Sequence, residues 1–311
     1  MNGGALVISL DLEMRWGILE SYNNFEDYKE NIIGVEPAVK SIIKTFSKYD
    51  IHASWATVGA LFCNDIEEFK DYAPKLYPSF NEKRFSSYTY INDIDKKQFF
   101  NYKLVDMIVN STNQELASHT YSHLFVNEYG VTSKDFDNDL KSFDKISIQK
   151  YDKKTKSFVF PRNQVSYLDT LKENGYKYFR GNKKEWFVLS NSFIAKLFRF
   201  YNLHFGSSKL ATTDIELENK LVDIKGTIFL RPYDNDFLTT LRIKKIKKVF
   251  KYAKNNNKIV HIWWHPHNFG KNLSKNIEML DEILKYANSI KLNSLNMAEV
   301  GENFEKNTIC S

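Results

Sequence analysis

The 311-residue sequence contains little cysteine and no long apolar run. Its two cysteines, Cys63 and Cys310, are too few for a disulfide scaffold or a cysteine-based zinc cluster, and they fit a reducing compartment. No apolar run approaches the roughly 20 residues of a bilayer-spanning helix. The amino terminus lacks the positive charge and the longer apolar core of a signal peptide. We therefore expect a cytoplasmic protein.

Internal repeats, low-complexity tracts and linkers rich in proline, glycine or serine are also missing. A single domain over residues 1–311 is therefore expected. The hydrophobic fraction of 42% and the charged fraction of 26% are ordinary for globular proteins, which excludes a wholly disordered or fibrous chain. The net charge of +6 is weak support for an acidic substrate or an anionic membrane surface, and we expect no nucleic-acid partner.

Strand-like runs alternate with helical patterns along the chain. Residues 5–12 are almost wholly apolar, as in a strand covered on both faces, and residues 36–48 follow with helical spacing. We predict further strands at 52–57, 115–118, 157–160, 176–179, 227–230, 258–264 and 289–292, and further helices at 98–111, 134–147, 166–174, 240–254 and 274–287. This alternation predicts an α/β fold with a parallel sheet, and about seven or eight strands favour a barrel.

Two segments, 77–90 and 182–225, interrupt the alternation and are interpreted as elaborations over one end of the barrel, where function tends to lie. Residues 183–209 combine lysine and arginine with several aromatic side chains. Such a mixture suits a peripheral helix in the lipid interface. The alternative is a lid that packs on the barrel.

Two acidic residues, Asp11 and Glu13, end the first predicted strand. Residues two apart in a strand point the same way, so both carboxylates could face the mouth of a barrel, where the active sites of parallel α/β barrels gather. A solvated pair at a strand end is the alternative interpretation.

Two histidines, His119 and His123, follow another predicted strand. Residues four apart share one face of a helical turn, which is a common way to supply two imidazoles to one metal. The alternative is two unrelated surface histidines.

A late strand carries the remaining candidate histidines. In an extended run His261, Trp263 and His265 point to one side, and Pro266 ends the strand after His265. His265 is then expected at the same end of the barrel as the acidic pair, where an imidazole could donate a proton near neutral pH. His261 is interpreted as a packed histidine, and the strand pattern alone does not assign a role to His267.

Taken together, these motifs resemble those of the polysaccharide deacetylase family (carbohydrate esterase family 4). The matching segments come in the family's order and are SLDLE (9–13), ASWATVG (53–59), ELASHTYSH (115–123), FVFPRN (158–163) and HP (265–266). The histidine-pair segment is the most specific of them. The resemblance implies a distorted (β/α)7-type barrel, one divalent metal that is usually zinc, and hydrolysis of an N-acyl or O-acyl group on a sugar.

The resemblance also implies roles for five residues: Asp11 as general base, Glu13, His119 and His123 as metal ligands, and His265 as general acid. Typical members have two adjacent aspartates, whereas here one residue separates the two acids. An exchange of roles between Asp11 and Glu13 therefore stays open.

The third motif departs from the family's pattern. Val159 occupies the usual arginine position, and Arg162 stands where a tyrosine is common. We expect either Arg162 or Arg231 to reach the base, and Arg162 is the candidate for a catalytic role. Structural ion pairs are the alternative for both arginines.

Aromatic residues beside the motifs are candidates for substrate binding, because sugar rings stack on aromatic faces. We assign Trp16, Trp263, Arg231 and His267 to substrate binding. Trp55 and Trp264 border predicted strands and are expected to pack in the core instead.

The predicted function is metal-dependent removal of an acetyl or formyl group from a sugar, or from a nucleotide- or polyprenyl-phosphate-linked precursor, in surface-polysaccharide biosynthesis. Peripheral contact with the inner membrane leaflet would suit a lipid-linked substrate. Two alternatives remain: a metal-independent cyclic amide hydrolase of the same fold, and a non-catalytic glycan-binding barrel.

Overall fold

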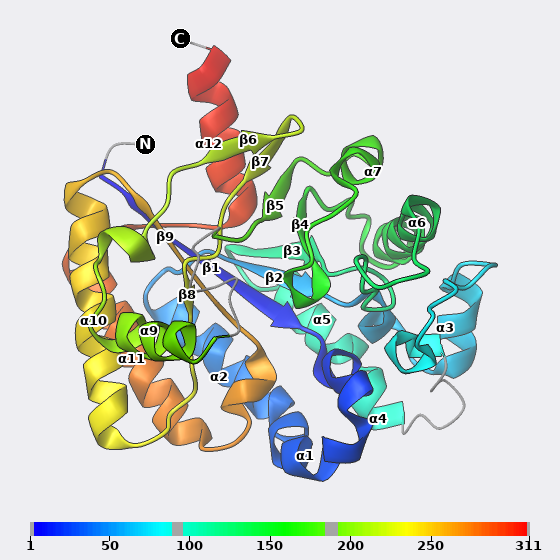
Figure 1. Ribbon diagram of the computed structural model, residues 1–311, viewed down its shortest axis with the longest axis horizontal. Coiled ribbons are helices and arrows are strands. Elements are labelled where there is room, and N and C mark those ends of the chain that lie inside the picture. Colours follow the sequence, from blue (N-terminus) through cyan, green and yellow to red (C-terminus); the bar gives the residue numbers. More distant parts are fainter. Residues whose placement is uncertain (1–2, 89–95, 184–191, 310–311) are drawn as a thin grey trace.

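The computed structural model describes residues 3–88, 96–183 and 192–309, and it contains one curled β-sheet with helices outside it (Figure 1). The strands are β1 (Ala5–Leu12), β2 (Ala53–Thr57), β3 (Gln114–Ser118), β4 (Ser157–Val159), β5 (Tyr178–Arg180), β6 (Glu216–Glu218), β7 (Leu221–Asp223), β8 (Ile228–Phe229), β9 (Ile259–Trp264) and β10 (Asn293–Leu295). Their order in the sheet is β6-β7-β5-β4-β3-β2-β1-β9-β8. The recorded strand pairs are parallel except for β6 with β7.

The sheet curls so that strands far apart in its order face one another. Three strands separate β1 from β5 in the sheet, yet the side chain of Arg180 on β5 contacts Asp11 on β1. β9 pairs with Ala5–Leu10 along one edge of β1, so β10, which pairs with Ala5–Val7, lies along the other edge together with β2, which pairs with Ile8–Leu12. The predicted α/β fold and its distorted barrel are confirmed.

Strand β1 runs through the centre of the molecule (Figure 1), and all eight of its residues are buried. Alternate side chains take opposite faces of a strand. The leucines and isoleucine at even positions of β1 join the largest apolar cluster, which includes residues of the outer helices, whereas Asp11 lies on the opposite face with Ser9. This alternation directs a polar row into the barrel.

The described helices are α1 (Phe25–Ile33), α2 (Val35–Lys48), α3 (Ile66–Tyr72), α4 (Lys96–Phe99), α5 (Tyr102–Val109), α6 (Ser133–Tyr151), α7 (Leu168–Glu173), α9 (Phe193–His204), α10 (Asp236–Asn255), α11 (Leu273–Ser289) and α12 (Met297–Ile309). None of these helices has the length and apolarity that crossing a bilayer demands. Helix α12 lies at the end of the molecule away from the carboxyl end of β1 (Figure 1).

Two predicted elements differ in the structure. The helix predicted at 98–111 is divided, because the side chain of Asn101 accepts a hydrogen bond from the Leu104 N–H and starts α5 as a new helix. The strand predicted at 289–292 is the end of α11 and the turn after it, and β10 begins only at Asn293. The backbone of Lys291 is left-handed there (φ 51°), which is incompatible with a continuous strand.

The segment at 182–225, predicted as an insertion, is partly built into the sheet. Residues 184–191 lie outside the described residues. After them, α9 packs against α10, and β7 pairs directly with β5. The carboxyl end of the segment is therefore a sheet strand rather than a loop over the barrel.

Candidate active site

The Asp11 carboxylate lies inside the barrel and is bound by Arg180. Both terminal nitrogens of Arg180 lie 2.7 Å from a carboxylate oxygen, and neither side chain is more than 3% exposed. Burial alone would raise the pKa of Asp11, but the charge and hydrogen bonds of Arg180 outweigh it and hold the pKa below its ordinary value. Asp11 is therefore ionised at neutral pH.

Glu13 lies at the centre of three histidines. Its Oε2 is 2.9 Å from Nε2 of His123 and 3.4 Å from Nε2 of His119, and its Oε1 is 3.4 Å from Nε2 of His265. Burial opposes ionisation of Glu13, yet the neighbouring imidazoles bring its pKa well below the usual value. Of the two acids, Glu13 is the one that faces the histidine pair.

The histidine pair is held by a loop and not by the predicted helical turn. The chain leaves β3 at Ser118, and Thr120 and His123 both adopt left-handed backbone angles (φ 62° and 58°). Asp139 on α6 accepts the backbone N–H groups of Tyr121 and Ser122, at 2.5 and 3.3 Å. Burial raises the pKa of Asp139 to about 6. This buried carboxylate offsets the cost of a loop in which two non-glycine residues have positive φ.

His119 has a fixed ring orientation. Its Nδ1 lies 2.8 Å from the Val159 carbonyl oxygen, which can only accept, so the Nδ1–H donates to it and Nε2 is the ring nitrogen left to face a ligand. That Nε2 is buried and has no hydrogen-bond partner among the described residues. Glu13, His119 and His123 each present one ligand atom, and these atoms lie within 4.8 Å of one another. One carboxylate and two imidazoles suit a divalent cation such as zinc, and a backbone hydrogen bond to the second nitrogen is typical of a ligating histidine.

His265 and His267 follow β9 and face the same acids from the other side. Nε2 of His265 lies 3.8 Å from Oδ2 of Asp11, and the His265 side chain is 24% exposed. His267 is buried, and its ring stacks on that of His265 with centroids 5.1 Å apart. The alternation of β9 thus places His265 at the strand's carboxyl end, beside the acidic pair.

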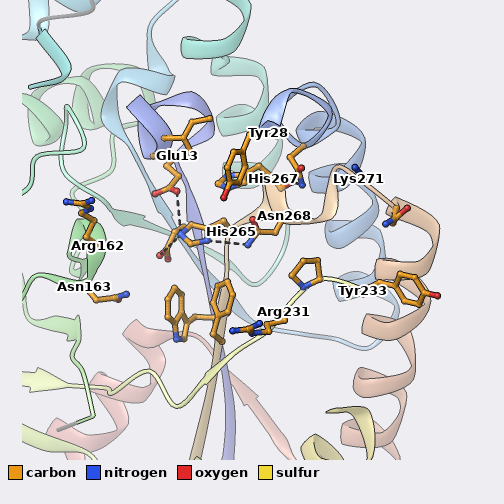
Figure 2. A pocket seen from close by; sticks show the side chains of 18 of the residues that line it. Glu13, Tyr28, Arg162, Asn163, Arg231, Tyr233, His265, His267, Asn268 and Lys271 are labelled. Atoms are coloured by element: carbon orange, nitrogen blue, oxygen red, sulfur yellow. Dashed lines mark hydrogen bonds and ion pairs between the residues drawn. The ribbon is translucent and has the colours of Figure 1, made fainter. Parts of the chain in front are cut away.

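Both acids, His123, His265 and His267 line a pocket of about 640 Å³, shown in Figure 2. Acids, histidines, cations and aromatic side chains all contribute to its lining. The lining includes Asp11, Glu13, Tyr28, His123, Arg162, Asn163, Phe229, Arg231, Tyr233, Trp263, His265, His267 and Lys271. A small ligand that enters this pocket therefore meets all the candidate catalytic groups.

The arginine recorded on Asp11 is a third one, which the sequence prediction did not consider. Arg162 lines the pocket, but its recorded ion pair is with Glu128, at 3.2 Å. Arg231 also lines the pocket and is exposed. The guanidinium on Asp11 belongs to Arg180, the last residue of β5, which the sequence prediction placed just after a short aromatic strand. Its position at the carboxyl end of a parallel strand is the signal that could have identified it.

A further hydrogen-bonded chain supports Arg180. The Ser9 hydroxyl accepts a hydrogen bond from Arg180 at 2.9 Å and lies 2.8 Å from Nε2 of His261. Nδ1 of His261 is 2.8 Å from the Ile224 carbonyl oxygen, and burial lowers the pKa of His261 to about 3. His261 is therefore a neutral, packed histidine, as predicted.

The tryptophans divide into core and pocket residues. Trp16 was assigned to substrate binding, but it is fully buried, stacks on Phe69 and donates its indole N–H to the Phe99 carbonyl. It is a core residue. Trp263 lines the pocket and lies under the guanidinium of Arg180, 4.3 Å from ring centroid to Cζ. Trp55 and Trp264 are buried in the main apolar cluster, as expected.

The comparisons with known proteins bear on the fold. No protein-family model matches the sequence, and no curated protein matches it. A solved structure from Mycobacterium smegmatis, assigned to the polysaccharide deacetylases, aligns over 99% of this chain and 92% of its own, with a TM-score of 0.63 at 11% identity. This chain has the polysaccharide deacetylase fold.

Two other solved structures share the deacetylase fold with this chain. The structure of Puue allantoinase aligns with 97% of this chain and 90% of its own chain, with a TM-score of 0.59 at 12% identity. The structure of a GH57-type branching enzyme from Pyrococcus horikoshii aligns with 95% of this chain and 70% of its own chain, with a TM-score of 0.54 at 10% identity. Identities this low show the fold alone, so the chemistry has to follow from the residues of the pocket.

Proposed function

We propose that this protein is a metal-dependent hydrolase that removes an N-acyl group, acetyl or formyl, from an amino sugar or its precursor. The observation that carries the proposal is the convergence of Glu13, His119 and His123 on one point, with Asp11 and His265 beside it. Buried histidines and carboxylates grouped at the floor of a pocket are typical of a hydrolytic centre.

Glu13, His119 and His123 would hold the cation. Bound there, a zinc ion would lower the pKa of water toward about 7 and polarise the acyl oxygen. Asp11 does not belong to this group of ligand atoms and is held instead by Arg180, which donates to both of its oxygens. This difference supports Glu13 as the ligand and Asp11 as the base, rather than the reverse.

Asp11 takes the proton of the attacking water. Each carboxylate oxygen has two lone pairs, so the hydrogen bonds from Arg180 leave acceptor capacity on both oxygens. Arg180 also fixes the direction of the carboxylate, which is the orientation that general base catalysis requires.

His265 delivers a proton to the departing amine. It lies on the opposite side of Glu13 from His123, and its partial exposure places it where a substrate can reach it. Amide cleavage needs such a donor, because an unprotonated amide nitrogen is a poor leaving group.

The pocket walls support a sugar substrate. Trp263 and Phe229 offer aromatic faces on which a sugar ring can stack, and their rings lie 4.8 Å apart. Arg231 and Lys271 line the same pocket and suit a phosphate group on a nucleotide or polyprenyl carrier. An acylated amino sugar attached to a phosphate carrier therefore fits the chemistry of both walls.

Acyl release tests this proposal directly. The purified protein is first analysed for bound metal and then incubated with N-acetyl and N-formyl amino-sugar nucleotides, with acetate and formate measured. Release by wild type and its loss in Asp11→Asn are expected. A metal-loaded protein that releases neither acid from the panel contradicts the proposal and favours a glycan-binding barrel. Opening of a cyclic amide by metal-free protein favours the second alternative, which has support in the fold shared with an allantoinase.

We further propose that the protein acts at the inner leaflet from the cytoplasm and that α9 is its contact with lipid. Phe193 and Ile194 are 74% and 68% exposed, and other large apolar side chains of α9 are exposed as well. Lys196 adds a positive charge to the exposed part of α9, and the neighbouring α10 exposes Lys244, Lys248 and Lys251. Exposed apolar and basic residues together suit an anionic lipid surface. α10 also follows directly on the loop that carries Arg231.

Liposome flotation tests the lipid contact. Wild type should float with vesicles that contain anionic lipid, and a Phe193→Ser/Ile194→Ser variant should stay in the soluble fraction. Leu76→Ser is the matched control, because Leu76 is 70% exposed but lies outside α9. Wild type that does not float, or a control that loses binding equally, contradicts the contact.

A further inference from the structure

The two carboxylate oxygens of Glu13 face two different groups of histidines. Oε2 points to the pair on the loop after β3, at 2.9 Å from His123 and 3.4 Å from His119. Oε1 points the other way, 3.4 Å from Nε2 of His265 (Figure 2). A carboxylate in this position can bridge two cations, an arrangement typical of centres with metals about 3.5–4 Å apart.

His267 completes the second group. Glu13, His265 and His267 each offer one ligand atom within 4.8 Å of the others. His267 is 4% exposed and lines the pocket, and its Nδ1 is buried with no hydrogen-bond partner among the described residues. Leaving a buried polar nitrogen unpaired costs free energy, which a ligand near that ring would offset.

We propose that Glu13, His265 and His267 form a second divalent-cation site, which shares Glu13 with the site on His119 and His123. One carboxylate oxygen and two imidazole nitrogens are the donor set of a zinc site that retains an open position. Asp11 is assigned to neither site, because its oxygens belong to neither group of ligand atoms that lie within 4.8 Å of one another.

The neighbourhood of His265 permits this role. The Asn268 side-chain amide lies 3.4 Å from Nδ1 of His265. The oxygen and nitrogen of such an amide can exchange places by rotation. With the oxygen toward the ring, it accepts the Nδ1 proton, and Nε2 of His265 then presents its lone pair toward Glu13.

Occupation of the second site would inhibit the hydrolysis, a consequence that rests on the proposed function. Nε2 of His265 cannot hold a cation and the proton for the leaving amine at the same time. The second cation should also bind more weakly than the first, because the two positive charges repel each other across one shared carboxylate. Turnover should therefore fall as the second site fills.

Zinc uptake by the full chain tests the second site. Wild type, His267→Phe and His119→Ala are dialysed against increasing zinc, and bound metal is measured together with turnover. His267→Phe keeps a ring that can stack on His265. His52→Ala is the control for loss of a histidine, because His52 pairs with Glu299 outside the pocket.

We expect wild type and His52→Ala to bind about two equivalents, the second of them weaker, and each pocket variant to bind about one. Wild-type uptake of one equivalent that depends on His119 but not on His267 overturns the second site and leaves the proposed function standing. One equivalent that depends on His267 but not on His119 keeps the second site and contradicts the ligand set of the proposed hydrolase. Protein that binds no zinc contradicts both.

Discussion

Arg180 and Asp11 lie 169 residues apart in sequence, yet each terminal nitrogen of the arginine is 2.7 Å from a carboxylate oxygen of the aspartate. The pair joins β5 to β1 across the inside of the barrel. Bidentate arginine–carboxylate pairs fix orientation as well as charge. The ion pair therefore links two strands of the curled sheet and fixes the direction of the proposed base at the same time.

Arg180→Met should destabilise the fold by about 3–5 kcal/mol, because it leaves the Asp11 charge buried without its partner. Urea denaturation measures this loss. The double variant Asp11→Asn/Arg180→Met should recover a large part of the stability, since no unpaired charge remains. Arg162→Met is the control: its ion pair with Glu128 involves a side chain that is 39% exposed, so it should cost less than about 1 kcal/mol. Equal losses from both single variants would contradict the role of Arg180.

Metal content should distinguish the role of Asp11 in β1 from that of Glu13, which follows the strand. Asp11→Asn should keep bound metal and lower kcat by about 10²–10⁴, because it removes the proton acceptor and leaves the ligands in place. Glu13→Gln should lose metal affinity, because it replaces the carboxylate that faces His119 and His123. Metal analysis and kinetics of both variants are the measurements. The opposite pattern, with metal lost only from Asp11→Asn, means that the two roles are exchanged.

Much of the site could be predicted because it follows from local pattern. The alternation of side chains along β1 places Asp11 inside the barrel. Pro266 ends the extended run that includes β9, which places His265 at the strand's carboxyl end. Each of these predictions needs only the geometry of one strand.

Arg180 and Trp16 could not be assigned in the same way. Arg180 reaches Asp11 only because the sheet curls, and curvature is set by how all the strands pack rather than by the spacing around one residue. Trp16 is next to the acidic motif in sequence, but the 3-10 helix Met14–Asn24 that follows β1 turns it into the core, against Phe69 and Phe99. The turn of the histidine loop likewise depends on Asp139, which comes from α6.

His265→Ala should affect substrates according to their leaving groups. Cleavage of an N-acyl sugar should slow by about 10²–10⁴, because the amine must be protonated as it leaves. An acyl ester of an acidic phenol needs no such proton, so its cleavage should slow far less. The ratio of the two kcat/KM values is the measurement, with metal content confirmed for the variant. An equal loss on both substrates would show that His265 does something other than donate a proton.

The two tryptophans near the motifs should respond differently to truncation. Trp16→Ala should cost about 3–5 kcal/mol of stability, because the indole is fully buried and bonded to the Phe99 carbonyl. Trp263→Ala should raise KM more than it lowers stability, because Trp263 lines the pocket and is only partly buried. Thermal denaturation and steady-state kinetics separate these effects. A raised KM for Trp16→Ala without loss of stability would restore its assignment to substrate binding.

Asp223 should make the stability of the protein depend on pH. It lies at the end of β7, where its carboxylate accepts the Gly181 N–H at 2.9 Å, and burial raises its pKa from 3.8 to about 7. A raised pKa in the folded state means that the stabilising contribution is complete below about pH 4 and is lost as pH rises through about 7. Asp223→Asn keeps a hydrogen-bond acceptor but carries no charge. It should therefore be more stable than wild type at pH 8, by no more than about 4 kcal/mol, and the advantage should shrink toward pH 4.

Urea denaturation between pH 4 and 8 measures this difference in stability. Asp169→Asn is the control, because Asp169 is 72% exposed. Wild type and Asp223→Asn with parallel stability curves between pH 4 and 8 would show that the Asp223 carboxyl ionises in the folded protein as readily as in the unfolded chain.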